Sequence, residues 1–176
     1  MKKILILGSS GAGKSTLAKK MGKILNFKVI HLDYYFWKPG WIQTPREEWK
    51  QVQVELICKN KNFIIDGNFH STIETRFPYA DTIIYLDFNK YLCLFRALKR
   101  YFQHRNKARP DMNSGCKEKI DIAFIKWIWN FNKEIKPYLM NLIKNDSKNK
   151  EIFILKSDRD IKRFLSKIKQ RKNETI

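Results

Sequence analysis

Short apolar runs alternate along the chain with longer stretches in which apolar residues recur at helical spacing. The apolar runs predict five strands, at residues 4–7, 28–32, 63–66, 82–87 and 152–155. The stretches between them predict helices at residues 14–26, 44–59, 89–104, 118–145 (interrupted at Pro137) and 158–169. Because the strand runs do not alternate with polar residues, both faces of each strand should be covered. The pattern therefore predicts an α/β fold, a three-layer α/β/α sandwich around a five-stranded parallel sheet.

Local motifs refine this pattern at three places. Thr44-Pro45-Arg46-Glu47 has the form of a capping box with proline at the first helical position, and Ser71-Thr72-Ile73-Glu74 is a second such motif. Residues 105–117 carry Pro110 and Gly115 and predict a loop between two helices.

The length and composition indicate one folded domain. The 176 residues are 43% hydrophobic and contain no Pro/Gly/Ser-rich linker, so we expect a single domain over residues 1–176. No apolar run is long enough to cross a bilayer. Cys58, Cys93 and Cys116 fit neither a disulfide framework nor a zinc site. We therefore expect a reduced, cytoplasmic protein that does not enter a membrane.

The formal net charge is +19, which suggests two interpretations. A basic protein can bind a polyanion such as a nucleotide, a nucleic acid or a membrane surface. Alternatively, the excess charge can be a lysine-rich solvated surface. Lysine dominates over arginine and is scattered along the chain, which favours the solvated surface for the charge as a whole.

The most specific motif follows the first predicted strand directly. It matches G-x-x-x-x-G-K-[ST] without a mismatch and comprises Gly8, Ser9, Ser10, Gly11, Ala12, Gly13, Lys14 and Ser15, followed by Thr16. Its glycines let successive backbone N–H groups turn inward around phosphate oxygens, and the following helix adds the positive end of its dipole. Lys14 would contact the β- and γ-phosphates, and the Ser15 hydroxyl would bind Mg²⁺. The motif predicts a nucleotide site of the P-loop type.

Two aspartates end predicted strands at the same edge of the sheet as this loop. The third strand ends in Asp66-Gly67-Asn68, and Asp66 would hold Mg²⁺ or its waters. The second strand ends in His31-Leu32-Asp33, and Asp33 would orient or deprotonate an acceptor hydroxyl, or contact the metal. His31 is interpreted as a strand-end residue only. No Asp-Glu strand end and no Asn/Thr-Lys-x-Asp stretch is present, which disfavours an ATPase and a GTPase.

Two further groups of residues are candidates for substrate contacts. The aromatic segment after Asp33, which includes Trp37, would enclose an acceptor or belong to the core. Arg96 and Arg100 share a predicted helix face, and Arg109 lies in the following loop. Guanidinium groups suit the charge of a transferring phosphoryl group. We therefore interpret residues 105–117 as a lid that closes over the nucleotide.

Together these motifs resemble a known protein family. The segments G-S-S-G-A-G-K-S-T, H-L-D, W-K-P-G-W, I-I-D-G-N, R-A-L-K-R, A-R-P-D-M and W-I-W-N occur in an order that resembles the bacterial DNA topology modulation proteins. These proteins are similar in turn to adenylate kinase and shikimate kinase. The resemblance extends from Lys3 to about Leu165, and it implies an adenylate-kinase-like sheet of strand order 2-3-1-4-5 that binds ATP and Mg²⁺.

The resemblance also implies roles for single residues. It matches Arg96 and Arg100 to lid arginines, Asp33 to the acceptor-side carboxylate, and Arg76 to an acceptor-binding arginine. Asn68 is likewise assigned to the acceptor. The segment Ser157-Asp158-Arg159 lies where such kinases hold adenine. Adenylate kinases follow Asp-Gly with Phe-Pro-Arg, whereas this chain has Asn-Phe-His, a departure that argues against a nucleoside monophosphate as acceptor.

The sequence therefore leaves two functional hypotheses. The first is a Mg²⁺-ATP phosphotransferase for a small acceptor, with nucleotides among the candidates, acting as a monomer or weak dimer. The second is a DNA-associated regulatory protein whose ATP site serves as a switch or is vestigial.

Overall fold

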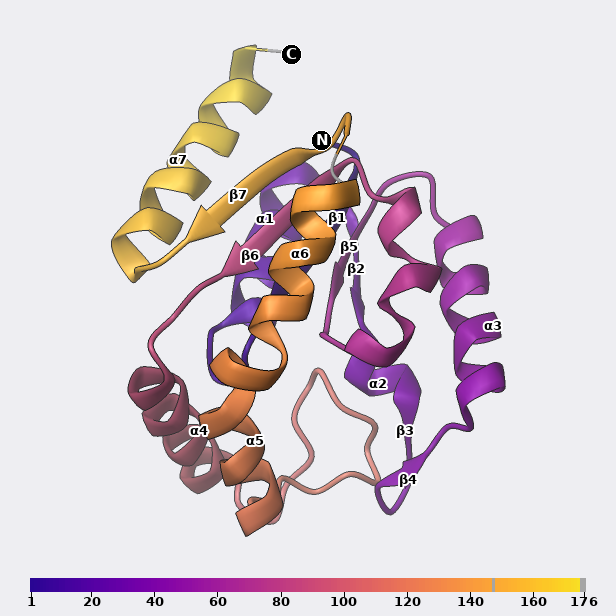
Figure 1. The fold of residues 1–176 in the computed structure, drawn as a ribbon, viewed down its shortest axis with the longest axis vertical. Helices are drawn as coiled ribbons and strands as arrows, with labels where there is room; N and C mark the ends of the chain where they lie inside the picture. Colours follow the sequence, from indigo (N-terminus) through magenta and orange to yellow (C-terminus); the bar gives the residue numbers. More distant parts are fainter. Residues whose placement is uncertain (147, 175–176) are drawn as a thin grey trace.

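The computed structural model describes residues 1–146 and 148–174. At its centre lies a sheet of five parallel strands, β1 (Lys3–Gly8), β2 (Lys28–His31), β5 (Phe63–Asp66), β6 (Thr82–Leu86) and β7 (Glu151–Leu155). The strand order is β2-β5-β1-β6-β7, which confirms the predicted order 2-3-1-4-5 and the predicted fold class (Figure 1).

Helices cover both faces of this sheet. The longer ones are α1 (Lys14–Leu25), α3 (Arg46–Cys58), α4 (Lys90–His104), α5 (Ile122–Glu134), α6 (Lys136–Asp146) and α7 (Asp158–Glu174). Successive side chains of a strand point to opposite faces, so β1 contributes to two cores. Ile4 and Ile6 pack with buried residues of α1, α4 and α7, whereas Leu5 and Leu7 pack with buried residues of α3, α5 and α6. The unbroken apolar pattern of β1 follows from this double burial.

Short elements that the sequence pattern did not predict follow β2 and β5 along the chain. They are helix α2 (Leu32–Phe36), the hairpin β3 (Trp37–Lys38) and β4 (Ile42–Gln43), and the 3₁₀ helices η1 (His70–Thr75) and η2 (Phe77–Tyr79). The second strand therefore ends at His31, and Asp33 lies in the first turn of α2, not at a strand end as predicted.

Both predicted capping boxes are wrong. The N-cap residue of α3 is Pro45, without a side-chain hydrogen bond to the helix. The Thr44 hydroxyl instead donates to the carbonyl oxygen of Phe36 at 2.7 Å, which ties the hairpin together. The Ser71–Glu74 motif lies inside η1 and caps no α-helix. In both places a tertiary contact or a tighter helix competes with the local motif.

The helix predicted for residues 118–145 differs at its start and at its break. It begins at Ile122, where the Asp121 carboxylate accepts a hydrogen bond from the Phe124 N–H at 2.7 Å. The break between α5 and α6 falls at Ile135, two residues before Pro137. Proline is compatible with the first turn of a helix, so Pro137 marks the start of α6.

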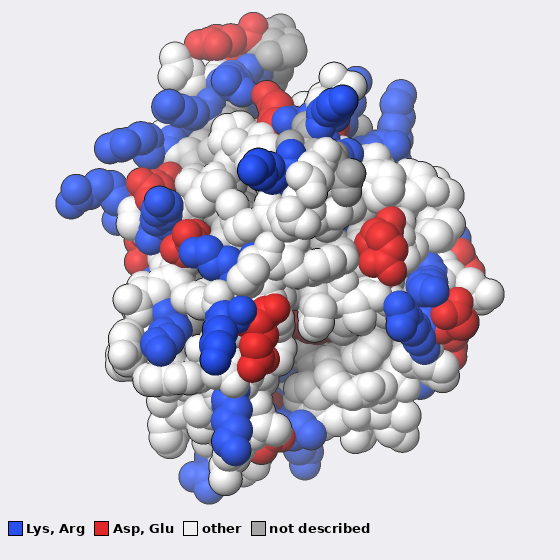
Figure 2. Space-filling view, in the orientation of Figure 1, with Lys and Arg blue, Asp and Glu red and all other residues white. Residues whose placement is uncertain are grey.

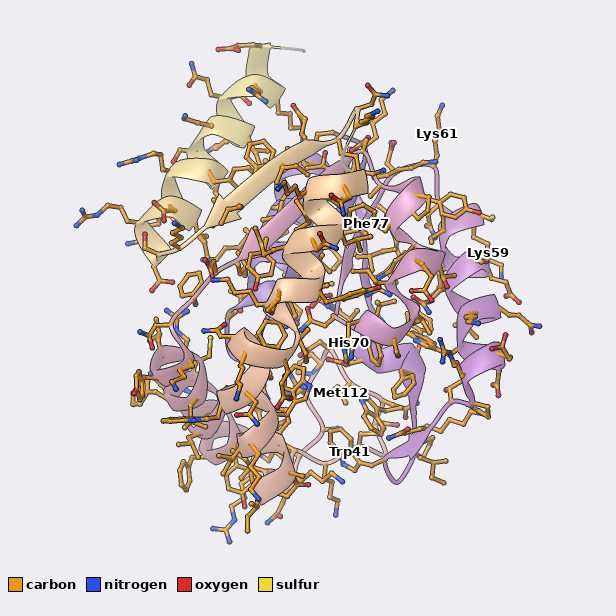
Figure 3. The ribbon with its side chains drawn as sticks, in the orientation of Figure 1. Trp41, Lys59, Lys61, His70, Phe77 and Met112 are labelled. Carbon is orange, nitrogen blue, oxygen red and sulfur yellow. The ribbon has the colours of Figure 1, made fainter. Side chains whose placement is uncertain are left out.

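The segment predicted as a lid leaves α4 and lies against the β3–β4 hairpin in the lower part of Figure 1. The Gly40 N–H donates to the Gly115 carbonyl oxygen at 3.1 Å, and the Trp41 indole N–H donates to the Lys117 carbonyl oxygen at 2.9 Å. A Cβ atom on Gly115 would lie 2.5 Å from the Pro39 Cβ, so only glycine allows this approach. Figure 3 shows Trp41 and the lid residue Met112 in this region. The segment 105–117 therefore packs against the hairpin.

The surface is strongly basic. Lysine and arginine side chains project over much of the visible face and gather along α7 (Figure 2). Among residues 1–146 and 148–174, none of the helices combines the length and the apolar content that spanning a bilayer requires.

Candidate active site

The loop between β1 and α1 has backbone angles that glycine permits. Gly8, Gly11 and Gly13 have φ values of 139°, 79° and 95°. A Cβ atom on Gly11 would lie 2.0 Å from the Cys93 carbonyl oxygen, so the loop packs directly on α4. A Cβ atom on Gly13 would meet no atom within 4 Å, so the loop is open on the side of the α1 N-terminus.

This opening has the properties of an anion site. Gly13 is the N-cap residue of α1 and offers no side chain to the first N–H groups of the helix. These N–H groups have no partner within the helix, and the helix dipole places partial positive charge at the same end. The loop therefore fits the phosphate groups that its sequence predicts.

Lys14 lies across the loop. Its ammonium group donates to the carbonyl oxygens of Gly8 and Ser9, at 2.8 and 2.9 Å. Burial lowers the pKa of Lys14, and the carboxylates of Asp33 and Asp66 oppose that shift. A cation thus lies within the loop, as the motif predicts.

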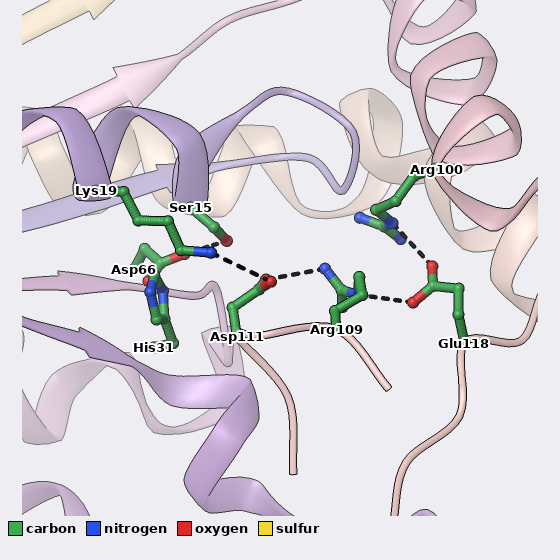
Figure 4. Close-up of polar contacts among 8 residues, drawn as sticks. All are labelled: Ser15, Lys19, His31, Asp66, Arg100, Arg109, Asp111 and Glu118. Atoms are coloured by element: carbon green, nitrogen blue, oxygen red, sulfur yellow. Dashed lines mark hydrogen bonds and ion pairs between the residues drawn. The ribbon is translucent and has the colours of Figure 1, made fainter. Parts of the chain in front are cut away.

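The Asp66 carboxylate lies between two side chains beside the loop (Figure 4). The Ser15 hydroxyl donates to Asp66 Oδ2 at 2.6 Å, and His31 Nδ1 lies 2.5 Å from Asp66 Oδ1. A hydroxyl and a carboxylate are oxygen donors of the kind that Mg²⁺ prefers, and the ion usually keeps several waters besides. Ser15 and Asp66 therefore fit the predicted metal. Within residues 1–146 and 148–174, no group of three His, Cys, Asp or Glu side chains forms a metal cage.

His31 belongs to the site, although the sequence suggested only a strand-end residue. It pairs with Asp66 in the parallel register of β2 and β5, so the two strands end together. The contact between His31 and Asp66 could have been predicted only from the pairing of β2 with β5, which requires the strand order to be known.

Asp33 lies in the first turn of α2 and is half-buried. Burial raises the pKa of its carboxyl group, and Lys14 opposes that shift. Arg109 and Asp111, in the segment 105–117, also act on the charge of Asp33. Asp33 thus lies near Lys14 and near that segment, although it does not end a strand.

Arg96 and Arg100 share a helix but have different surroundings. Arg96 Nη2 lies 2.5 Å from Asp158 Oδ2 on α7 and lines a hollow of about 190 Å³. The hollow lies beside the α1 N-terminus, and its other lining residues include Gly13, Thr16, Lys20 and Ile161. Asp158 lines the hollow, whereas Ser157 does not. The Ser157 hydroxyl instead accepts a hydrogen bond from the Asp160 N–H at 3.1 Å.

Arg100 belongs to a chain of charged side chains that joins α1, the lid and α4 (Figure 4). From one end to the other, Lys19 pairs with Asp111 at 3.6 Å, Asp111 with Arg109 at 2.9 Å, Arg109 with Glu118 at 2.7 Å, and Glu118 with Arg100 at 2.8 Å. The Glu118 side chain is only 3% exposed. We name these five residues the lid charge chain.

The lid charge chain explains the electrostatics of Arg100 and Asp111. Burial and the neighbouring Arg109 lower the pKa of Arg100, and Glu118 opposes that shift. Burial alone would raise the pKa of Asp111, but Arg109 and Lys19 hold it below its usual value. Glu118 and Lys19 lie in no motif of the sequence, and Asp111 was given no role although it belongs to the A-R-P-D-M segment.

We expect the substitution Glu118→Gln to destabilise the fold. It keeps the shape of the side chain but leaves Arg100 without its carboxylate partner and Arg109 with Asp111 alone, a loss of about 3 kcal/mol. Urea denaturation measures the free energy of unfolding. Glu55→Gln is the control, because Glu55 pairs with Lys59 on the exposed surface of α3 at 3.1 Å and should cost at most about 0.5 kcal/mol. Equal stabilities of the two variants would contradict the bridging role of Glu118.

Two residues that were assigned to the acceptor lie in the interior. Arg76 has no exposed surface, and it donates to Gln53 Oε1 at 2.8 Å, to the Gly67 carbonyl oxygen at 3.2 Å and to the Asn68 carbonyl oxygen. The predicted acceptor contact of Arg76 is therefore wrong, because its buried guanidinium group donates its hydrogen bonds to the turn after β5 and to Gln53. Asn68 is 7% exposed, and both polar atoms of its side chain bind Gly8, which conflicts with a substrate contact.

The other predicted acceptor residues lie around the lid. Trp37 is half-buried in β3 and packs edge-on against Phe36 and Trp41, with ring centroids 4.9 and 5.3 Å apart. Arg109 is held by the lid charge chain, close to Asp33. The structure thus brings Arg109 near Asp33, whereas the Trp37 ring packs within the hairpin.

Comparisons with known proteins give no match by sequence: no protein-family model and no curated protein matches the chain. Solved structures match by shape. Shikimate kinase from Acinetobacter baumannii, in complex with shikimate, has a TM-score of 0.62 and 14% identity over 99% of this chain and 94% of that chain. Shikimate kinase from Bacteroides thetaiotaomicron has a TM-score of 0.55 and 17% identity over 97% of each chain.

A third match is deoxyadenosine kinase from M. mycoides with the products dCMP and dCDP bound, with a TM-score of 0.50 and 16% identity over 99% of this chain and 100% of that chain. At such identities the likeness shows the fold alone. Nothing in these matches supports the resemblance to DNA topology modulation proteins. The chain has the fold of the adenylate-kinase-like P-loop kinases.

Proposed function

We propose that the protein is a Mg²⁺-dependent ATP phosphotransferase that phosphorylates a hydroxyl group of a small acceptor, with nucleotides among the candidates. The observation that carries the proposal is the arrangement of the phosphate loop, where Lys14 and the open α1 N-terminus lie beside the Ser15–Asp66 pair. The fold shared with shikimate and deoxyadenosine kinases supports it.

On the nucleotide side, the loop N–H groups and Lys14 bind the β- and γ-phosphates. Ser15 and Asp66 hold Mg²⁺, which when bound neutralises charge on the phosphate oxygens. The hollow lined by Thr16, Arg96 and Asp158 accommodates the base and ribose, because it lies directly beside the α1 N-terminus. Ser157 orders the chain next to it through its hydrogen bond to the Asp160 N–H.

On the acceptor side, Asp33 orients the acceptor hydroxyl and takes its proton. The acceptor oxygen forms a bond to the γ-phosphorus, the bond from that phosphorus to the β–γ bridging oxygen breaks, and ADP leaves. Arg100 and Arg109 stabilise the charge of the transferring group when they exchange their carboxylate partners for phosphate oxygens. The lid and Trp37 enclose the acceptor and exclude water.

The acceptor can be found with an assay for ADP release. Purified protein with Mg²⁺-ATP is offered nucleosides, nucleoside monophosphates, hydroxy acids of the shikimate type, and neutral polyols. One class should raise ADP release well above the rate without acceptor. If no acceptor does so although ATP binds, the phosphotransferase proposal fails.

We expect Asp33→Asn to slow transfer without weakening ATP binding. The amide keeps the shape but cannot accept the proton, so kcat should fall about 10²–10³-fold while the Kd for ATP changes little. Steady-state kinetics and equilibrium titration measure the two effects. Asp81→Asn is the control: Asp81 accepts hydrogen bonds from the Lys2 and Lys3 N–H groups at the opposite edge of the sheet. A kcat for Asp33→Asn equal to that of the control would remove Asp33 from the mechanism.

The basic surface motivates a second candidate function, a DNA-associated regulator whose ATP site acts as a switch. Lysine and arginine gather along α7, and the net charge is +19. Fluorescence anisotropy with duplex DNA should then show affinity that falls steeply as salt rises yet survives at physiological ionic strength. Binding of only nonspecific strength would reject this candidate. For either function we propose a cytoplasmic monomer or weak dimer.

A further inference from the structure

The Asn68 side chain binds both backbone polar groups of Gly8, the residue with which β1 ends and the phosphate loop begins. Asn68 Oδ1 accepts a hydrogen bond from the Gly8 N–H at 3.0 Å, and Asn68 Nδ2 donates to the Gly8 carbonyl oxygen at 2.6 Å. Asn68 is 7% exposed, so both hydrogen bonds are shielded from water. One carboxamide thus satisfies the donor and the acceptor of a single loop residue.

The position of Asn68 follows from the strand register. β1 and β5 pair in parallel up to Ile6 and Asp66, and the same register would place residue 68 opposite Gly8. The chain turns away at Gly67, where φ is 129°, so the backbone of β5 cannot continue the ladder. On its other side Gly8 still pairs with Leu86 of β6. The Asn68 side chain therefore replaces the strand at the one position where the phosphate loop leaves the sheet.

Gly8 is also a partner of Lys14. The Gly8 carbonyl oxygen accepts from Asn68 Nδ2 and from the Lys14 ammonium group at 2.8 Å, and so uses both of its lone pairs. When Lys14 turns toward a phosphate, the Asn68 amide still satisfies this buried oxygen. Without Asn68, movement of Lys14 would leave the oxygen unpaired, which is costly in the interior.

Asn68 is held in place by the core. Its carbonyl oxygen and that of Gly67 accept hydrogen bonds from Arg76, which is fully buried. A Cβ atom on Gly67 would lie 2.8 Å from the Leu32 Cβ, so this turn packs closely on α2. Arg76 and Leu32 thus hold the turn at Gly67 and Asn68 from two sides. The Asn68 side chain can therefore hold the phosphate loop in a fixed position.

We propose that Asn68 is a positioning residue for nucleotide binding, which holds Gly8 and thereby sets the phosphate loop and Lys14 relative to the sheet. The inference rests on the proposed function only as far as nucleotide binding. It replaces the acceptor contact that the sequence suggested, since both polar atoms of this buried side chain are bonded to Gly8.

The experiment is a titration of each purified variant with a fluorescent ADP analogue in the presence of Mg²⁺. Asn68→Ala removes both hydrogen bonds and should raise the Kd about tenfold or more. Asn68→Asp keeps the shape of the side chain and the acceptor for the Gly8 N–H, but it loses the donor to the Gly8 carbonyl oxygen. Its Kd should therefore lie close to that of Asn68→Ala. The matched control is Asn60→Ala, which removes a donor to the Leu56 carbonyl oxygen at 2.7 Å, far from the loop, and should leave the Kd within about twofold.

A double variant separates positioning from general damage. If Asn68 acts through Gly8 and Lys14, Asn68→Ala should weaken binding much less in a Lys14→Ala background than in the wild type. Equal losses in both backgrounds, or an unchanged Kd in folded Asn68→Ala, would overturn the inference. Should Asn68→Ala not fold, the isosteric Asn68→Asp carries the same comparison. Wild-type protein that binds no nucleotide would instead refute the proposed function.

Discussion

Lys14→Ala is expected to reduce kcat/KM for phosphoryl transfer by about 10³-fold, the largest functional effect of any single substitution considered for this chain. The ammonium group is the cation inside the phosphate loop, with its nitrogen 2.8 Å from the Gly8 carbonyl oxygen. Arg100 and Arg109 start from Glu118 and are assigned to the transferring group, so neither takes the place of Lys14 inside the loop. Initial rates of ADP release with the best acceptor measure the loss.

The control for this substitution is Lys23→Ala. Lys23 lies in the last turn of the same helix and is exposed, so its removal should leave kcat/KM within about twofold. Titration with ATP adds a second readout, in which Lys14→Ala should bind more weakly. If Lys14→Ala kept both the rate and the affinity of the wild type, the loop would not be a phosphotransfer site.

Arg76→Leu is expected to have the largest effect on stability, about 3–5 kcal/mol, because it leaves three buried acceptors without a donor. Burial lowers the pKa of Arg76 to about 9, so the group remains protonated at neutral pH. Leucine would leave Gln53 Oε1 and the carbonyl oxygens of Gly67 and Asn68 without a buried donor. Such a loss is a large share of the total stability of an ordinary domain. Urea denaturation followed by circular dichroism measures it.

Arg46→Leu serves as the comparison, because Arg46 is exposed and donates to the Ser71 carbonyl oxygen at 3.1 Å. It should cost less than about 1 kcal/mol. The pair of variants also separates the two roles considered for Arg76. An acceptor-binding arginine would lose activity and keep stability, whereas a core arginine loses stability first. Full stability of Arg76→Leu would restore the acceptor role.

The lid charge chain has a consequence for how the site closes. Arg100 and Arg109, which would meet the transferring phosphoryl group, share Glu118 as their carboxylate partner in this structure. Phosphate oxygens must therefore compete with Glu118 for the same guanidinium groups. Because Asp111 joins the chain to Lys19 on α1, the exchange would also loosen the contact of the lid with the helix of the phosphate loop.

The sheet and the phosphate loop could be predicted from the sequence because both depend on local patterns. Each strand shows an apolar run, since both of its faces are covered, and the glycines around Lys14 satisfy backbone angles that other residues avoid. Asp66 follows from the same logic, because it ends a strand at the edge where the loop lies. The strand order was an expectation from resemblance, and the structure has it.

Local patterns failed where a long-range contact decides the conformation. Thr44 has the form of a helix cap, yet its hydroxyl binds the Phe36 carbonyl oxygen, because the hairpin brings the two together. Asp33 was expected to end a strand, but α2 begins one residue before it. In both cases the local sequence is compatible with more than one conformation, and contacts with distant parts of the chain select the one that forms. The neighbouring residues in the sequence do not show those contacts.

The roles of the polar side chains around the loop were decided by tertiary structure alone. The sequence suggested substrate contacts for Arg76 and Asn68, but both side chains are buried. Arg76 binds the turn after β5, and Asn68 binds the backbone of Gly8. His31 meets Asp66 only because β2 pairs with β5 in register. The sequence by itself determined a phosphate loop on a parallel sheet, since backbone angles and apolar periodicity are local. Which polar groups serve the ligand and which serve the fold depends on burial and on partners far away in the chain, so only the folded chain determines it.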